Sequence, residues 1–231
     1  MHTVSYQPPM LTIEYGPAFT MRNVARIPGD SGTYLSLKPL TGNNSPSNSS
    51  RVQVILPVKQ GTFRLYYAPL VIHGQGLLKQ PTTFSESQFL PDIPTDALYE
   101  FRSYRVTYRR PWKKTDGWSL EIGGTVKVRD ATISLRQAGV SGADSNVGWV
   151  PLVHISGSKT LTARIGMEFD FDGLAGGPGR AFDIGARMQY SVSRDQALGV
   201  GVRTIEGGAN VPRVFNFTWL LSPVMTFSQK L

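Results

Sequence analysis

The groups best suited to chemistry gather in the third quarter of the chain. His154 and Ser156 stand two residues apart, and the first carboxylate that follows them is Glu168. A serine hydrolase needs its hydroxyl, imidazole and carboxylate within hydrogen-bond reach, about 3 Å. The sequence Ser-Gly-Ser-Lys at 156–159 predicts a tight turn, which would place His154 opposite about Thr162. Glu168 would then lie about 20 Å further along the strand, so these residues predict no catalytic triad.

The acidic residues that come next could in principle bind a cation. Asp170-Phe171-Asp172-Gly173 resembles the start of a calcium loop, but the other ligands of an EF-hand are missing. The chain contains no cysteine, which excludes thiol catalysis, disulfides and zinc sites built on cysteine. We therefore expect no catalytic residue, no metal site and no cofactor.

The element that must position these groups is a strand predicted at 160–172. Its odd positions, from Leu161 to Phe171, are apolar, and its even positions, from Thr160 to Asp172, are small, polar or charged. This period of two is typical of a β-strand with one apolar and one polar face.

The same alternation recurs along the chain and predicts about ten strands. They are expected at 11–20, 51–58, 63–72, 103–109, 118–135, 147–156, 160–172, 182–192, 198–203 and 215–228. Long and short connections alternate, which is typical of a transmembrane antiparallel up-and-down β-barrel. We expect an all-β fold, a single domain over 1–231, a periplasmic tail at 1–9, and long external loops at about 22–49, 74–98 and 136–146.

Composition limits the partners. Of the 231 residues 40% are hydrophobic, and no run approaches the roughly 18 apolar residues of a membrane helix. The net charge is +8, but the basic residues are scattered along alternating strand positions and form no nucleic-acid motif. The predicted partners are membrane lipid and lipopolysaccharide, with no nucleic acid, and the chain is expected to be a monomer.

The two faces of the strands predict lipid outside and a polar lumen inside. The apolar faces carry bulky side chains, too large for one small barrel to hold, whereas the opposite faces are rich in Gly, Ser and Thr. Aromatic residues gather at the strand ends, as in the two girdles of a membrane barrel. These residues are Trp112, Trp118, Tyr190 and Phe227 at the turn end, and Trp149, Phe171, Phe182 and Phe215 at the loop end.

The charged residues divide into a predicted lumenal network and candidates at the external mouth. The network comprises Glu14, Arg51, Arg64, Arg105, Arg109, Glu121, Lys127, Arg164, Glu168, Arg187 and Arg203. The mouth candidates are Asp170, Asp172, Asp183, Arg129 and Glu206. Unpaired charges inside a barrel would be costly, so we expect the lumenal set to be paired.

From Leu11 to Phe227 the chain resembles the bacterial outer-membrane β-barrel proteins, in its alternating strands, alternating loop lengths and aromatic-rich last strand. The resemblance implies location in the bacterial outer membrane. Two enzyme families of this class share features with the chain. His154-Ile-Ser156 is similar to the His-x-Ser pair of the lipid A deacylases, and the ten strands are similar to those of the omptin proteases, whose Asp-x-His motif this chain lacks.

Two functions remain open from the sequence. The first is a structural, surface or small-pore barrel without enzymatic activity, its lumen filled by the charged network. The alternative is an enzyme at the outer leaflet, either a lipid A-modifying hydrolase or an omptin-like protease, with its site at the external mouth.

Overall fold

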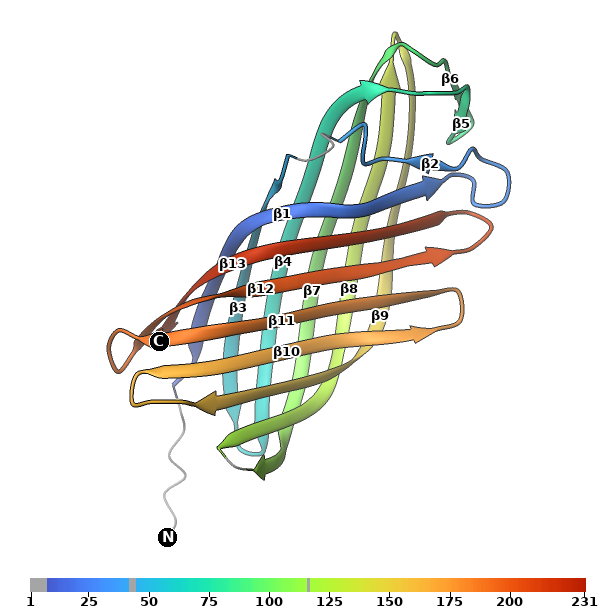
Figure 1. Cartoon of the computed structure of the whole chain (residues 1–231). Helices are drawn as coiled ribbons and strands as arrows, with labels where there is room; N and C mark the ends of the chain where they lie inside the picture. The colour runs from blue at the N-terminus through green and yellow to red at the C-terminus, as the bar shows by residue number, and fades with distance from the viewer. Residues whose placement is uncertain (1–7, 42–44, 116) are drawn as a thin grey trace.

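A computed structural model describes residues 8–41, 45–115 and 117–231. Ten long antiparallel strands form a closed barrel, because β1 pairs with both β3 and β13 (Figure 1). The strands are β1 (Met10–Arg26), β3 (Ser47–Val58), β4 (Gly61–Leu77), β7 (Pro94–Thr115), β8 (Trp118–Gln137), β9 (Val140–Thr160), β10 (Ile165–Gly176), β11 (Gly179–Ser191), β12 (Gln196–Asn210) and β13 (Phe215–Lys230). The predicted fold class is confirmed.

Shorter strands belong to the connections at one end. β2 (Leu35–Ser36) pairs with the end of β1, and β5 (Thr82–Phe84) pairs with β6 (Ser87–Phe89). We call this the external end, because outer-membrane barrels carry their longer loops there and their short turns on the periplasmic side. Within the described residues no helix is long and apolar enough to cross a membrane. Residues 1–7 of the predicted tail lie outside the described part of the chain.

The faces of the strands are the reverse of those in a water-soluble barrel. Apolar side chains point outward and are exposed, as at Ile13, Val106 and Met225. Charged side chains point inward and are buried, as at Arg64 and Arg105, which are only 3% and 4% exposed. Such an exterior is stable in lipid and would be unfavourable in water.

Two outward-facing charged clusters mark the external border of this apolar surface. Arg102 bonds Asp130 at 3.2 Å and also pairs with Glu100, and Arg180 bonds Glu206 through both carboxylate oxygens. The hydrogen bond that Arg102 donates to Asp130 and the charge of Glu100 raise the pKa of Arg102, and the hydrogen bonds that Arg180 donates to Glu206 raise the pKa of Arg180. Groups held in their charged form belong beside the headgroups rather than in the hydrocarbon.

The predicted turn at 156–159 is wrong. β9 continues through it to Thr160, and the chain reverses at Leu161–Arg164 instead. Thr162 shapes this reversal, because its hydroxyl oxygen accepts from the backbone N–H groups of Arg164 and Ile165, at 3.3 and 3.0 Å. Short polar side chains favour such turns. The strand predicted from Thr160 therefore starts at Ile165.

The predicted loops are partly corrected. β1 extends to Arg26 and β4 to Leu77, so the first two connections are shorter than expected. The third, at about 136–146, is mostly strand: β8 and β9 continue to a turn at Ala138 and Gly139, both with positive φ. The polar composition there indicated a loop, but pairing with β8 holds this segment extended.

Prolines on the outer face lie where strand pairing is interrupted. Pro17 and Pro223 stand opposite each other at a break in the β1–β13 ladder, and Pro69 lies in a break between β3 and β4. Pro151 lies beyond the end of the β9–β10 ladder. Because proline has no N–H to donate, these positions lose little by its presence.

The apolar core of the molecule lies inside the external end. Leu37 and Leu40 of the first connection and Phe84 and Phe89 of the β5–β6 hairpin are at most 1% exposed, and they pack with residues such as Leu135 of β8. The first two connections therefore fold inward over the barrel strands.

Candidate functional site: a charge-filled lumen beneath an external cavity

Asp172 on β10 connects four strands across the lumen. One carboxylate oxygen pairs with Arg64 and, at 3.0 Å, with Arg105. The other accepts a hydrogen bond from Thr125 at 2.8 Å and lies 2.8 Å from Nδ1 of His154. The side chain of Asp172 is 1% exposed, so these partners replace the water that its charge would otherwise require.

Arg203 on β12 makes a second set of cross-barrel bonds. Its guanidinium donates to Glu14 at 2.8 Å, to both oxygens of Asp170 at 3.0 and 3.1 Å, and to Asp183 at 2.6 Å. Arg51 also binds Glu14, at 2.8 Å. Paired bonds between a guanidinium and a carboxylate are among the stronger charged hydrogen bonds in proteins.

The two sets join through Arg105, which pairs with Asp172 and, at 2.7 Å, with Asp183. The guanidinium of Arg105 also lies 4.8 Å from the ring centre of Tyr66. We call the connected, buried group the ion-pair lattice. Its members are Glu14, Arg51, Arg64, Tyr66, Arg105, Thr125, His154, Asp170, Asp172, Asp183 and Arg203.

Of the remaining predicted network residues, four face the lumen nearer the periplasmic end, Lys127 lies in the cavity nearer the external end, and one exception does not face the lumen. Arg109 pairs with Glu121 at 3.1 Å, and Arg187 pairs with Glu168 at 2.6 Å. The exception is Arg164, which is exposed in the β9–β10 turn and donates to the Tyr190 hydroxyl at 3.2 Å. Its predicted lumenal position depended on the misplaced turn.

Three predicted mouth residues lie elsewhere. Asp170, Asp172 and Asp183 are buried within the ion-pair lattice rather than exposed at the mouth. Glu206 points outward, where it binds Arg180. Arg129 faces inward near the external end and donates to Asn146 at 2.6 Å.

The surroundings of His154 also differ from the sequence prediction. The carboxylate beside His154 is Asp172, its partner in the β9–β10 register, rather than Glu168. Ser156 receives a hydrogen bond from Arg109 at 2.9 Å and lies 3.4 Å from Glu121. His154 is 0% exposed, so this arrangement gives no solvent-accessible nucleophile and base.

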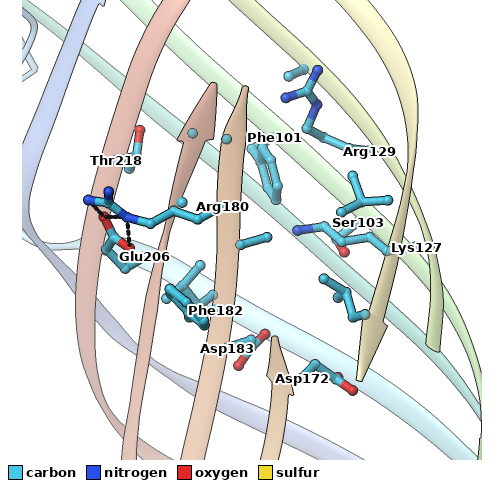
Figure 2. A pocket seen from close by; sticks show the side chains of 18 of the residues that line it. Phe101, Ser103, Lys127, Arg129, Asp172, Arg180, Phe182, Asp183, Glu206 and Thr218 are labelled. Carbon is cyan, nitrogen blue, oxygen red and sulfur yellow. Dashed lines mark hydrogen bonds and ion pairs between the residues drawn. The ribbon is translucent and has the colours of Figure 1, made fainter. Parts of the chain in front are cut away.

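A cavity of about 480 Å³ lies on the external side of the ion-pair lattice (Figure 2). Figure 2 shows Lys127 reaching into it, with Asp172 and Asp183 at its lower end in that view. Its volume is in the range of small-molecule sites, about 300–1,000 Å³. Apolar inward-facing side chains form much of the wall: Leu70, Tyr99, Phe101, Ala131, Leu152, Leu174, Ile205 and Leu220.

Lys127 and Arg129 are the cations of the cavity that stand outside the ion pairs. They are successive inward positions on β8. Within the described residues no carboxylate lies within 4.0 Å of either side chain. Lys127 is 5% exposed, and its ammonium lies 4.8 Å from the ring centre of Phe101. Arg129 gives the cavity a positive charge, and Lys127 adds a second basic group.

The cavity was not predicted from the sequence, although the sequence contains a signal for it. Leu70, Leu152 and Leu220 are bulky apolar residues on the inward faces of their strands, which also carry the polar and charged residues. Tyr66 shares the inward face of Arg64 and could have been added to the network on the same grounds.

No family model and no curated protein sequence matches the chain. Solved structures do. The outer membrane protease OmpT of Escherichia coli aligns over 100% of this chain and 99% of its own, with 7% identity and a TM-score of 0.61. An outer membrane channel of Pseudomonas putida F1 aligns over 100% of both chains, with 7% identity and a TM-score of 0.46. Ail, the attachment invasion locus protein of Yersinia pestis, aligns over 96% and 99%, with 9% identity and a TM-score of 0.42.

The likeness to OmpT shows the barrel fold of a bacterial outer-membrane protein. The apolar exterior of this chain is the surface that such a fold presents to lipid. Fold and exterior together place the protein in the bacterial outer membrane.

Proposed function

We propose that this outer-membrane barrel is closed to solute flow and works at its external end, where the cavity binds a small ligand. One observation carries the proposal: the ion-pair lattice joins strands on all sides of the lumen directly below the cavity. Of the roles left open by the sequence, this favours a surface function over a small pore. The barrel would meet membrane lipid and lipopolysaccharide as a monomer.

The chemistry of the lattice supports closure. Each of Asp170, Asp172 and Asp183 pairs with two or more basic groups, and each is less than 10% exposed. An ion that moved through would have to displace these bonds, and the groups left behind would be buried without partners. A channel needs binding weak enough for ions to leave again.

Planar-bilayer recording tests the closed lumen. The wild-type protein should give no conductance steps at moderate voltage, whereas the double substitution Arg105→Ala with Asp172→Ala should give them. The matched control is Arg180→Ala with Glu206→Ala, which removes an ion pair on the outer face and should leave the bilayer silent. Reproducible wild-type steps would replace the proposal with the small-pore hypothesis.

The alternative remains an enzyme at the outer leaflet. OmpT is described as an outer membrane protease, and an omptin-like activity would need acidic groups that a substrate can reach. Here the three candidate aspartates are held by arginines inside the barrel. Hydrolysis assays on protein in lipopolysaccharide test this, and turnover that disappears in Asp170→Ala and Asp183→Ala would favour the enzyme.

A further inference from the structure

The barrel wall is divided at its external end, between β9 and β10. Backbone pairing of these strands ends at Val153 and Gly173. β9 continues to Val140 and remains paired with β8 on its other side, while β10 continues only to Gly176. Within the described residues, the stretch 140–152 of β9 therefore has no strand paired along its second edge.

The outermost part of that edge is covered by two connections. Ser85 and Ser87 of the β5–β6 hairpin donate to the carbonyl oxygens of Ala143 and Ser141, at 2.7 and 2.8 Å. Arg213, from the β12–β13 connection, binds Asp144 at 2.9 Å and the carbonyl oxygen of Ser145 at 2.8 Å. What remains is an opening between residues 146–152 of β9 and 174–176 of β10, which we call the side window.

The external cavity extends to this window. Its lining includes Trp149 and Pro151 on the β9 side, and Ala175 and Pro178 on the opposite side. Trp149, Pro151 and Ala175 belong to the two edges that face each other across the opening, and Pro178 lies in the turn that follows β10. The cavity therefore meets the exterior through the barrel wall.

The window opens at the level of the membrane. Val147 and Trp149 point outward beside it and are 64% and 74% exposed. Phe171 and Phe182 lie beside each other on the outer face of the opposite edge, with ring centres 6.2 Å apart and the rings tilted by 31°. In hydrocarbon an open sheet edge is tolerated only where it lines a cavity or is covered, and an occupant of the window would cover this one.

The charges lie immediately behind the window. Lys127 pairs in register with Val150, and Arg129 with Gly148, so the two cations stand one strand from its β9 edge. Phe101, Ile205 and Leu220 add apolar wall to the same cavity. A positive entrance and an apolar interior match an acidic headgroup joined to a hydrocarbon chain.

We propose that the external cavity binds an acyl lipid with an acidic headgroup, which enters from the outer leaflet through the side window. The headgroup binds Lys127 and Arg129, and the acyl chain occupies the apolar interior. This inference rests on the proposed function, since it names the ligand of the same cavity.

A fluorescent fatty acid, 11-(dansylamino)undecanoic acid, tests the headgroup. With the folded full-length protein in phosphatidylcholine vesicles, its fluorescence should rise saturably. The double substitution Lys127→Met with Arg129→Met should weaken binding by tenfold or more, about the effect of losing charged hydrogen bonds. The control is Lys113→Met with Lys114→Met, two exposed cations at the other end of β7, which should bind as the wild type does.

A reversible cross-link tests the route. Pro151→Cys and Ala175→Cys would face each other across the window and point outward, and the chain contains no other cysteine. A bifunctional methanethiosulfonate, which joins the two cysteines through mixed disulfides and releases methanesulfinate, should slow probe binding by about tenfold, an effect that reduction of the same sample reverses. The same reagent across Ile184→Cys and Thr204→Cys, a paired position on β11 and β12, should have no effect.

The outcomes are distinct. Wild-type protein that does not bind the probe saturably, or that binds it equally without Lys127 and Arg129, overturns the proposed ligand. Unchanged binding rates after cross-linking overturn the lateral route. Neither of these results depends on conductance in planar bilayers. Only conductance of the wild-type protein would overturn the closed barrel.

Discussion

The two halves of this barrel share one wall pattern but differ in what that wall encloses. Toward the periplasm, inward positions hold Arg64, Arg105 and Asp172, and the strands around them pair in register. Toward the exterior, inward positions hold Phe101 and Leu220, and the β9–β10 pairing ends. The ion-pair lattice fills and ties together one half, whereas the other half keeps an open cavity. The difference separates a structural region from a region available for binding.

The largest effect should come from the ion-pair lattice. Arg203→Ala removes one basic partner from each of Glu14, Asp170 and Asp183 at once, so three buried carboxylates lose part of their charge compensation. We expect a loss of about 3–5 kcal/mol in the free energy of unfolding, measured by urea titration in lipid vesicles. A loss below 1 kcal/mol would mean that the lattice does not hold this half together.

Removing apolar packing from the external end should have a different, more local effect. Leu37 is 0% exposed in the core formed by the first connection, and Leu37→Ala should cost about 2–5 kcal/mol at that site. Hydrogen exchange should accelerate at 27–41 and in the β5–β6 hairpin, while amides near Arg64 keep their protection. Faster exchange throughout the barrel would show that the two halves are one cooperative unit.

This contrast also explains what the sequence could and could not predict. Strict alternation assigned the inward and outward faces, because lipid and lumen select opposite side chains at every second residue. It could not place the turn at Leu161–Arg164, since the alternation of apolar and polar residues continues through that turn. That one error displaced Arg164 and separated His154 from Asp172.

The cavity was harder to predict for a physical reason. Leu152 and Leu220 line the same cavity as Lys127 because strands far apart in the sequence meet in one barrel. No local sequence pattern shows which residues will share that cavity. The polar segment 136–146 likewise has the composition of a loop but is held as strand by its partners on β8. In the first case the partners are distant in the sequence, and in the second they lie in the same hairpin, but in both the pairing of strands overrides local composition.

The connection across the side window gives a smaller, regional prediction. Arg213 is 59% exposed where it binds Asp144, so Arg213→Ala should change the free energy of unfolding by no more than about 1 kcal/mol. It should nevertheless increase hydrogen exchange at 144–152 and speed binding of the dansyl fatty acid. Lys79→Ala, at an exposed site in the same group of connections, is the control. Unchanged exchange would mean that Arg213 does not restrain the window.

The smallest effect on stability is expected from a substitution at Pro151. This substitution distinguishes the unpaired edge of the side window from a paired strand. Pro151→Val adds a backbone N–H but no hydrogen bond between strands, because the β9–β10 pairing has already ended at Val153. Stability should therefore change by less than about 0.5 kcal/mol, as for most substitutions away from packed or paired sites. The reverse change at a paired outward position, Val200→Pro, removes a donor from a central strand and should destabilise the barrel by about 3 kcal/mol or more. If Pro151→Val instead stabilised the protein and slowed exchange along 146–152, β9 and β10 would be pairing across the window, and the division between the two halves would disappear.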